Sequence, residues 1–220
     1  MPWTHRTASR RGRVLAAAAG CLLLASCTWT GTSGTPPRSV SSESAPAGEG
    51  MPRAPRDEGA WLAAVDRIYG DVGGGMSAEQ WLRLRMARRR PDERLAVLMG
   101  IDDVMLRTHF GGVDTLVPRS VRFARTAHAL GYSVFYVTGR SAASGLEQVE
   151  ATLQRSDVPA NAFYGRPVGA TSEEAAKAQC RASIVRQGYT LAVDVAASEA
   201  SFDGRPLPEK EIRLPDFAVP

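Results

Sequence analysis

The feature that most constrains the fold is an alternation of strand and helix patterns from residue 95 to residue 198. Apolar runs at residues 95–99, 132–139 and 189–198 ("LAVLM", "YSVFYVTG" and "YTLAVDVAAS") have the composition of buried strands. Because strands that are apolar on both faces belong to parallel sheets covered by helices, the pattern predicts an α/β fold. We expect a three-layer sandwich with a mainly parallel central sheet. The helices predicted between these strands are residues 117–131, 141–156 and 170–188.

Two further helices are predicted ahead of the sheet. The segment at residues 58–72 carries large apolar residues at helical spacing. The segment at residues 77–89 begins with Ser77 and Gln80 in a capping-box arrangement, in which each side chain binds the other residue's backbone N–H. We expect the side chains that pack inward to be Trp61, Leu62, Val65, Ile68, Tyr69, Trp81, Leu84 and Met86.

The first 26 residues have the layout of a secretory signal peptide. Four arginines precede an Ala- and Leu-rich core that is too short to span a bilayer as a mature helix. The core ends in "LASC" at residues 24–27, which resembles a bacterial lipobox, and cleavage there would leave Cys27 as a lipidated N-terminus. An ordinary signal peptide with an incidental cysteine is the alternative. Ser9, Arg10 and Arg11 leave twin-arginine export open beside the general secretory route.

The chain divides into three parts by composition. Residues 1–26 are the signal peptide, and residues 27–57 are rich in Ser, Thr, Gly and Pro, which predicts a disordered tether behind the lipidated Cys27. Residues 58–220 are long enough for one domain with a core of its own. We therefore expect an extracytoplasmic protein held at the cell membrane by its N-terminal lipid.

Net charge gives no support for nucleic-acid binding. The whole chain has 27 Lys and Arg against 23 Asp and Glu, and four of those arginines lie in the signal peptide. The processed chain is therefore close to neutral. A local basic cluster at Arg83, Arg85 and residues 88–90 is typical of a solvated helix face.

One cysteine, Cys180, remains in the domain after the signal peptide is removed. A single cysteine can form neither an internal disulfide nor a metal cluster. Cys180 shares a helical stripe with Ala176 and Ile184, which predicts that it is buried as a small apolar side chain.

Polar residues follow the ends of all three predicted strands. Asp102 follows the first strand, Thr138 ends the second, and Ser198 ends the third. The carboxyl ends of parallel strands meet at one edge of a sheet, where ligands bind in open α/β folds. We expect the functional site there.

Three motifs in this order resemble the haloacid dehalogenase superfamily: "AVLMGIDDVML" at residues 96–106, "VFYVTGR" at 134–140 and "EEAAKAQCRASIVRQGY" at 173–189. The greatest similarity is to its secreted acid phosphatases, the class C bacterial lipoprotein phosphatases and the plant vegetative storage proteins. The resemblance covers about residues 58–220. It implies a Rossmann-like three-layer sandwich of the haloacid dehalogenase type with N-terminal helices.

The resemblance also implies a role for each motif residue. In the family, one aspartate attacks phosphorus and a second acts as the acid and base, while a hydroxyl and a lysine hold the phosphoryl oxygens. These positions correspond to Gly100, Asp102, Thr138 and Lys177, with Gly139 beside the hydroxyl. Other roles remain open: Asp102 as a loop cap, Thr138 as a helix cap and Lys177 as a solvated helix residue.

The family binds Mg²⁺ through oxygen ligands, and this chain departs from that pattern. A direct alignment puts Ala197 and Ser201 where the family has aspartates. A shift of two residues would bring in Glu199 and Asp203 as ligands beside Asp102. The resemblance therefore implies no cofactor for an inactive site, and Mg²⁺ if the site is active.

Gly100 is the departure that decides the prediction, because glycine cannot form an aspartyl-phosphate. Asp103 is expected to point to the other face if the chain stays extended, and Asp102 as nucleophile would leave no acid. His109 and His128 have no surrounding motif that would replace the nucleophile.

We therefore predict a pseudoenzyme that binds a ligand, such as a phosphate-containing small molecule, or a protein partner at the cell surface. The alternative is an active or weakly active Mg²⁺-dependent acid phosphatase that hydrolyses phosphate monoesters.

Overall fold

The computed structural model describes residues 56–141, 146–167, 170 and 172–217. The signal peptide, Cys27 and nearly all of the predicted tether lie outside the described residues. In the part that is described, no helix is both long enough and apolar enough to span a membrane.

The centre of the fold is a five-stranded sheet in the order β5-β4-β1-β6-β7, with every neighbouring pair parallel. This confirms the predicted α/β class with a central parallel sheet. The three predicted strands form its middle, and two short edge strands were not predicted. The strands are β1 (Arg94–Gly100), β4 (Ser133–Ser141), β5 (Ala162–Arg166), β6 (Tyr189–Ala196) and β7 (Lys210–Arg213).

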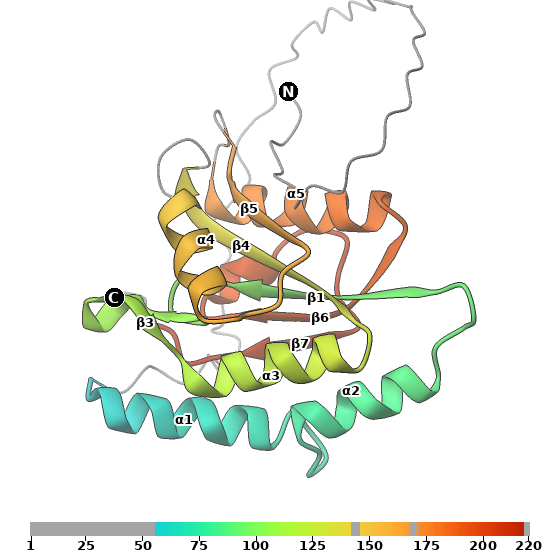
Figure 1. The fold of residues 1–220 in the computed structure, drawn as a ribbon, viewed down its shortest axis with the longest axis horizontal. Coiled ribbons are helices and arrows are strands. Elements are labelled where there is room, and N and C mark those ends of the chain that lie inside the picture. Colours follow the sequence, from blue (N-terminus) through green and yellow to red (C-terminus); the bar gives the residue numbers. More distant parts are fainter. Residues whose placement is uncertain (1–55, 142–145, 168–169, 171, 218–220) are drawn as a thin grey trace, which may run out of the picture. The chain divides into compact units, whose positions relative to one another are not determined.

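Helices cover both faces of the sheet (Figure 1). Residues of α1 to α4 share one hydrophobic core with one sheet face, and α5 covers the other face. A small antiparallel hairpin, β2 (Leu106–Arg107) and β3 (Gly112–Leu116), follows β1. The helices are α1 (Glu58–Gly70), α2 (Ala78–Ala87), α3 (Pro118–Ala129), α4 (Leu146–Arg155) and α5 (Glu173–Arg186).

The N-terminal helices form largely as predicted. Both hydrogen bonds of the Ser77–Gln80 capping box are present. The prediction for Leu84 is wrong, because that side chain is 44% exposed while Leu82 is fully buried. Leu82 lies four residues after the buried Ala78, on the same helix face, and Leu84 lies on the opposite one.

Helix α5 buries Cys180 on one stripe with Ala176 and Ile184, as predicted. Burial raises the pKa of the Cys180 thiol well above its usual value. The thiolate form that would react is therefore disfavoured, and Cys180 acts as a packing residue.

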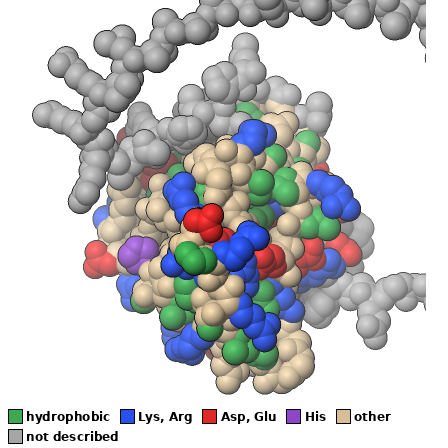
Figure 2. All heavy atoms as spheres, turned by 90° about the vertical axis from the view of Figure 1, so that its right-hand side faces the viewer, with side chains coloured by type: hydrophobic (Ala, Val, Ile, Leu, Met, Phe, Trp, Pro, Cys, Tyr) green, Lys and Arg blue, Asp and Glu red, His purple; other side chains and the backbone are tan. Residues whose placement is uncertain are grey.

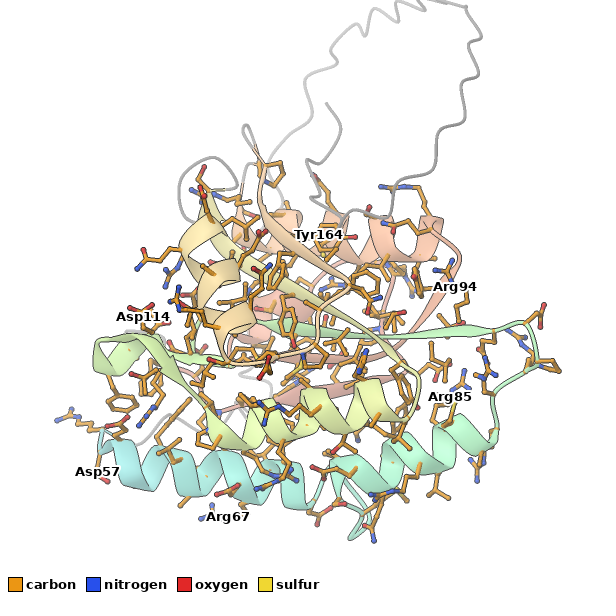
Figure 3. The ribbon with its side chains drawn as sticks, viewed as in Figure 1. Asp57, Arg67, Arg85, Arg94, Asp114 and Tyr164 are labelled. Carbon is orange, nitrogen blue, oxygen red and sulfur yellow. The ribbon has the colours of Figure 1, made fainter. Side chains whose placement is uncertain are left out.

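Charged side chains gather at the end of the molecule where the strands begin, and some of them form ion pairs with one another. Figure 2 shows acidic and basic side chains adjoining there, and Figure 3 labels Arg85 and Arg94 at this end. Arg85 bonds both Glu93, at 2.6 Å, and Glu209, at 2.5 Å. The predicted solvated face therefore holds for Arg83 and residues 88–90, which are exposed, but not for Arg85.

Candidate functional site

A pocket of about 220 Å³ lies at the carboxyl ends of β1, β4 and β6. Parallel strands direct their last residues to this edge, and the first turn of α5 and a C-terminal residue, Asp216, complete the wall. The structure therefore brings together the residues that the sequence motifs singled out. The residues around the pocket include Gly100, Asp102, Thr138, Gly139, Lys177 and Ser198.

Asp102 is the most heavily bonded side chain of the pocket. Its Oδ2 accepts from Thr138 Oγ1 at 2.6 Å, and its Oδ1 accepts from Thr108 Oγ1 at 3.1 Å. Arg140 donates to the same Oδ1 through Nε at 3.0 Å and Nη2 at 2.6 Å. Three of these four bonds go to Oδ1 and one goes to Oδ2, so two strand ends and the hairpin segment all hold this carboxylate.

Arg140 was not predicted to have a role at the site. Its side chain reaches from the end of β4 to Asp102, and its backbone N–H donates to Thr138 Oγ1 at 3.1 Å. The signal was present in the sequence, since Arg140 directly follows the Thr–Gly pair of "VFYVTGR". Its direction, toward the first strand, could not be read from the sequence.

The position of the expected nucleophile is closed by packing. A Cβ atom on residue 100 would lie 2.9 Å from Val104 Cγ2 and 3.4 Å from the carbonyl oxygen of Val195. Real Cβ contacts are essentially never as short as the first of these distances. Any side chain at position 100 therefore requires Val104 to move.

The chain stops being extended directly after β1, which corrects the expectation for Asp103. The Ile101 carbonyl oxygen accepts from Met105 and Leu106, so the backbone turns, and Asp103 has a positive φ of 53°. As a result Asp102 and Asp103 both line the pocket instead of pointing to opposite faces. Burial raises the pKa of Asp103, although the backbone N–H of His109 donates to its Oδ1 at 2.7 Å.

Lys177 faces the pocket and already has two partners. Its Nζ lies 2.6 Å from Glu173 Oε1 and donates to Ser201 Oγ at 2.6 Å. The Glu173 side chain also covers Gly139, where an added Cβ would lie 2.7 Å from Glu173 Cδ. Sequence reasoning gave Glu173 no role, although its spacing of four residues from Lys177 is the spacing of a helical ion pair.

The residues present do not fit Mg²⁺. Glu199 and Asp203 are absent from the pocket wall: Glu199 lies 3.4 Å from Arg213 Nη1, and Asp203 is exposed. Asp102 already accepts hydrogen bonds from Arg140, Thr138 and Thr108. Within the described parts of the chain, no group of three or more Asp, Glu, His or Cys side chains could hold one.

A fully buried charged residue of α5, Arg181, lies one helix turn after Lys177. Its Nη1 lies 3.5 Å from Oδ2 of Asp194, which is on β6 and is also buried. Burial raises the pKa of Asp194 to about 7, despite the opposing effect of Arg181. The guanidinium group further donates to backbone carbonyl oxygens of the loop after β6, namely those of Ser201, Asp203, Gly204 and Pro206.

The two domain histidines with described positions take no part in the pocket lining. The His109 ring stacks on Phe217 with centroids 3.7 Å apart and meets Phe110 edge-on. His128 is exposed on α3. Neither histidine therefore lies where the motif resemblance predicts a nucleophile.

Comparison with known proteins adds no relative: no family model matches the chain, and no curated protein matches it.

Proposed function

We propose that residues 58–220 are an acid phosphatase-like domain of the haloacid dehalogenase type that has lost catalysis and acts by binding. The observation that carries the proposal is the glycine at the expected nucleophile position of the first motif, residues 96–106. Gly100 provides no nucleophile, and Val104 fills the space that a longer side chain would need. Losing a nucleophile typically lowers the rate of such an enzyme by several orders of magnitude.

The remaining acid is also unsuited to catalysis. A general acid or base must exchange a proton with the substrate across a hydrogen bond. Asp102 instead directs its oxygens to Arg140, Thr138 and Thr108. The group that the family uses for proton transfer is here a fixed link between two strand ends and the hairpin segment.

What supports binding is the pocket and the polar groups around it. Its volume of about 220 Å³ is smaller than the ~300–1,000 Å³ of typical ligand pockets, so the ligand group that enters is small. Thr138, Gly139 and Lys177 line this pocket, and in the motif resemblance they correspond to the residues that hold phosphoryl oxygens. A phosphate or phosphate monoester is therefore the proposed ligand.

Hydrolysis of a chromogenic phosphate ester tests this proposal. The full-length chain purified in detergent should release phosphate no faster with Mg²⁺ than its Asp102→Asn variant. Turnover that requires Mg²⁺ and disappears in Asp102→Asn would contradict the proposal in favour of an active phosphatase.

We also propose that the domain is displayed outside the cytoplasm on a lipid anchor at Cys27. The lipobox-like "LASC" and the Ser-, Gly- and Pro-rich segment behind it support this. Cys27→Ala should move the protein out of the membrane fraction or leave it unprocessed. A mature N-terminus at another residue, without lipid, would contradict the anchor.

A further inference from the structure

The phosphoryl position of the pocket already contains a negatively charged group of the protein itself. The Glu173 carboxylate contacts Lys177, the lysine expected to hold an anion, at 2.6 Å. The same carboxylate lies over Gly139, so close that a Cβ there would be 2.7 Å from Glu173 Cδ. Glu173 thus contacts both the amine and the strand end that an incoming anion would use.

We propose that Glu173 is an internal occupant of the anion position and that a ligand binds only by displacing its carboxylate. This inference rests on the proposed binding function, and it assigns to Glu173 the control of which anions enter. The absence of a side chain at Gly139 leaves the space that the Glu173 carboxylate occupies.

Glu173 is positioned so that it can leave. Its side chain is 48% exposed, whereas that of Lys177 is 12% exposed. Glu173 is the first residue of α5, so its side chain can turn toward solvent without any change in the helix. Lys177 would keep its bond to Ser201 Oγ during the exchange. An anion that replaces Glu173 therefore meets a lysine that is already oriented.

Displacement sets a condition on the ligand. A ligand carboxylate has one negative charge and two oxygens. It therefore offers Lys177 no more than the Glu173 carboxylate does. A phosphoryl group brings a charge of about −1.5 to −2 and three acceptor oxygens. The pocket should therefore select phosphate and phosphate monoesters over acetate and other simple carboxylates.

The test compares two neighbouring acids of the same helix turn. Glu173→Gln removes the proposed occupant, and Glu174→Gln removes an equal charge from the helix start without changing the pocket wall. Binding of inorganic phosphate and of acetate is measured by calorimetry on the full-length chain in detergent. Circular dichroism verifies that both variants are folded.

We expect Glu173→Gln to bind phosphate on the order of tenfold more tightly than wild type, because Lys177 no longer has a competing carboxylate. Glu174→Gln should bind phosphate as wild type does, and Glu173→Gln/Lys177→Ala should lose the gain. Equal phosphate affinity in the two single variants, including no binding in either, would overturn the inference. Turnover of an ester by wild type would instead overturn the proposed function, so the two failures are distinguishable.

Discussion

Two aspartate–arginine pairs of this fold differ in burial and in the elements that they join. The pair of Asp194 and Arg181 is almost completely inaccessible, with side chains 4% and 0% exposed. In the pair of Asp102 and Arg140, Asp102 lines the pocket, and the two side chains are 32% and 27% exposed. The first joins β6, α5 and the following loop, and the second joins the ends of β1 and β4.

The comparison shows how the burial of an ion pair determines its contribution to the stability of the domain. A buried arginine must satisfy its donors inside the protein, and Arg181 does so on backbone carbonyl oxygens. The pair of Asp102 and Arg140 is partly exposed, and water screens the attraction between its charges. The partly exposed pair should therefore contribute less to the stability of the domain than the buried pair.

The largest effect is expected from Arg181→Met. It leaves the buried carbonyl oxygen of Ser201 without this donor, removes further bonds to the partly buried carbonyl oxygens of Gly204 and Pro206, and separates Asp194 from its partner. Breaking a buried pair typically costs about 3–5 kcal/mol of the free energy of unfolding. Urea unfolding measures this cost. The matched variant Arg140→Met should cost about 1 kcal/mol or less, because its pair is partly exposed. Similar losses in both variants would remove the distinction between the two pairs.

The next effect is the pH dependence of stability that comes from Asp194. Its pKa in the fold is raised to about 7, whereas an unfolded Asp titrates near ~3.9. Between these values the folded state holds the additional proton, so stability falls as the pH rises, by at most ~1.4 kcal/mol per unit. Below this window, stability falls as the pH falls. Arg85 lowers the pKa of Glu93 to about 2, and carboxylates of this kind lose their stabilising charge there.

Asp194→Asn separates this contribution from the rest. Its unfolding free energy, measured by urea titration between pH 4.5 and 7, should vary less with pH than that of wild type. A wild-type slope in Asp194→Asn would mean that another group carries the pH dependence.

A smaller effect is expected from introducing a carboxylate at position 100. Gly100→Asp forces Val104 to move, and overpacking of this kind costs typically ~1–3 kcal/mol. Val104→Ala relieves the contact, so the double variant should be more stable than the sum of the single effects implies, by ~0.5 kcal/mol or more. Thermal unfolding of the four proteins gives the coupling. Simple additivity would show that Val104 does not close the position.

The sequence predicted the parts of the fold that long apolar patterns determine. The middle strands and the helices follow from such patterns, and the capping box follows from two residues at fixed spacing. The edge strands β5 and β7 were missed because each has only four or five residues. In such short segments a strand pattern does not differ clearly from a loop.

The sequence predicted several residues that line the pocket, but not the ion pairs and hydrogen bonds between their side chains. Strand ends and motif order placed Asp102, Thr138 and Lys177 together, because parallel strands share one carboxyl edge. The partners Arg140 and Glu173 could not be predicted, because long side chains can turn to several neighbours. The position of Asp103 depended on a turn after Gly100 that no residue pattern indicated.

The most direct test of the central claim is whether the chain can be phosphorylated on an aspartate. The protein is incubated with Mg²⁺ and acetyl phosphate, and its intact mass is measured. Gly100 supplies no nucleophile and Asp102 is held by Arg140. We therefore predict that the mass of the wild-type protein does not change, as in the Asp102→Asn variant. An added phosphoryl group that maps to Asp102 or Asp103 would contradict the account.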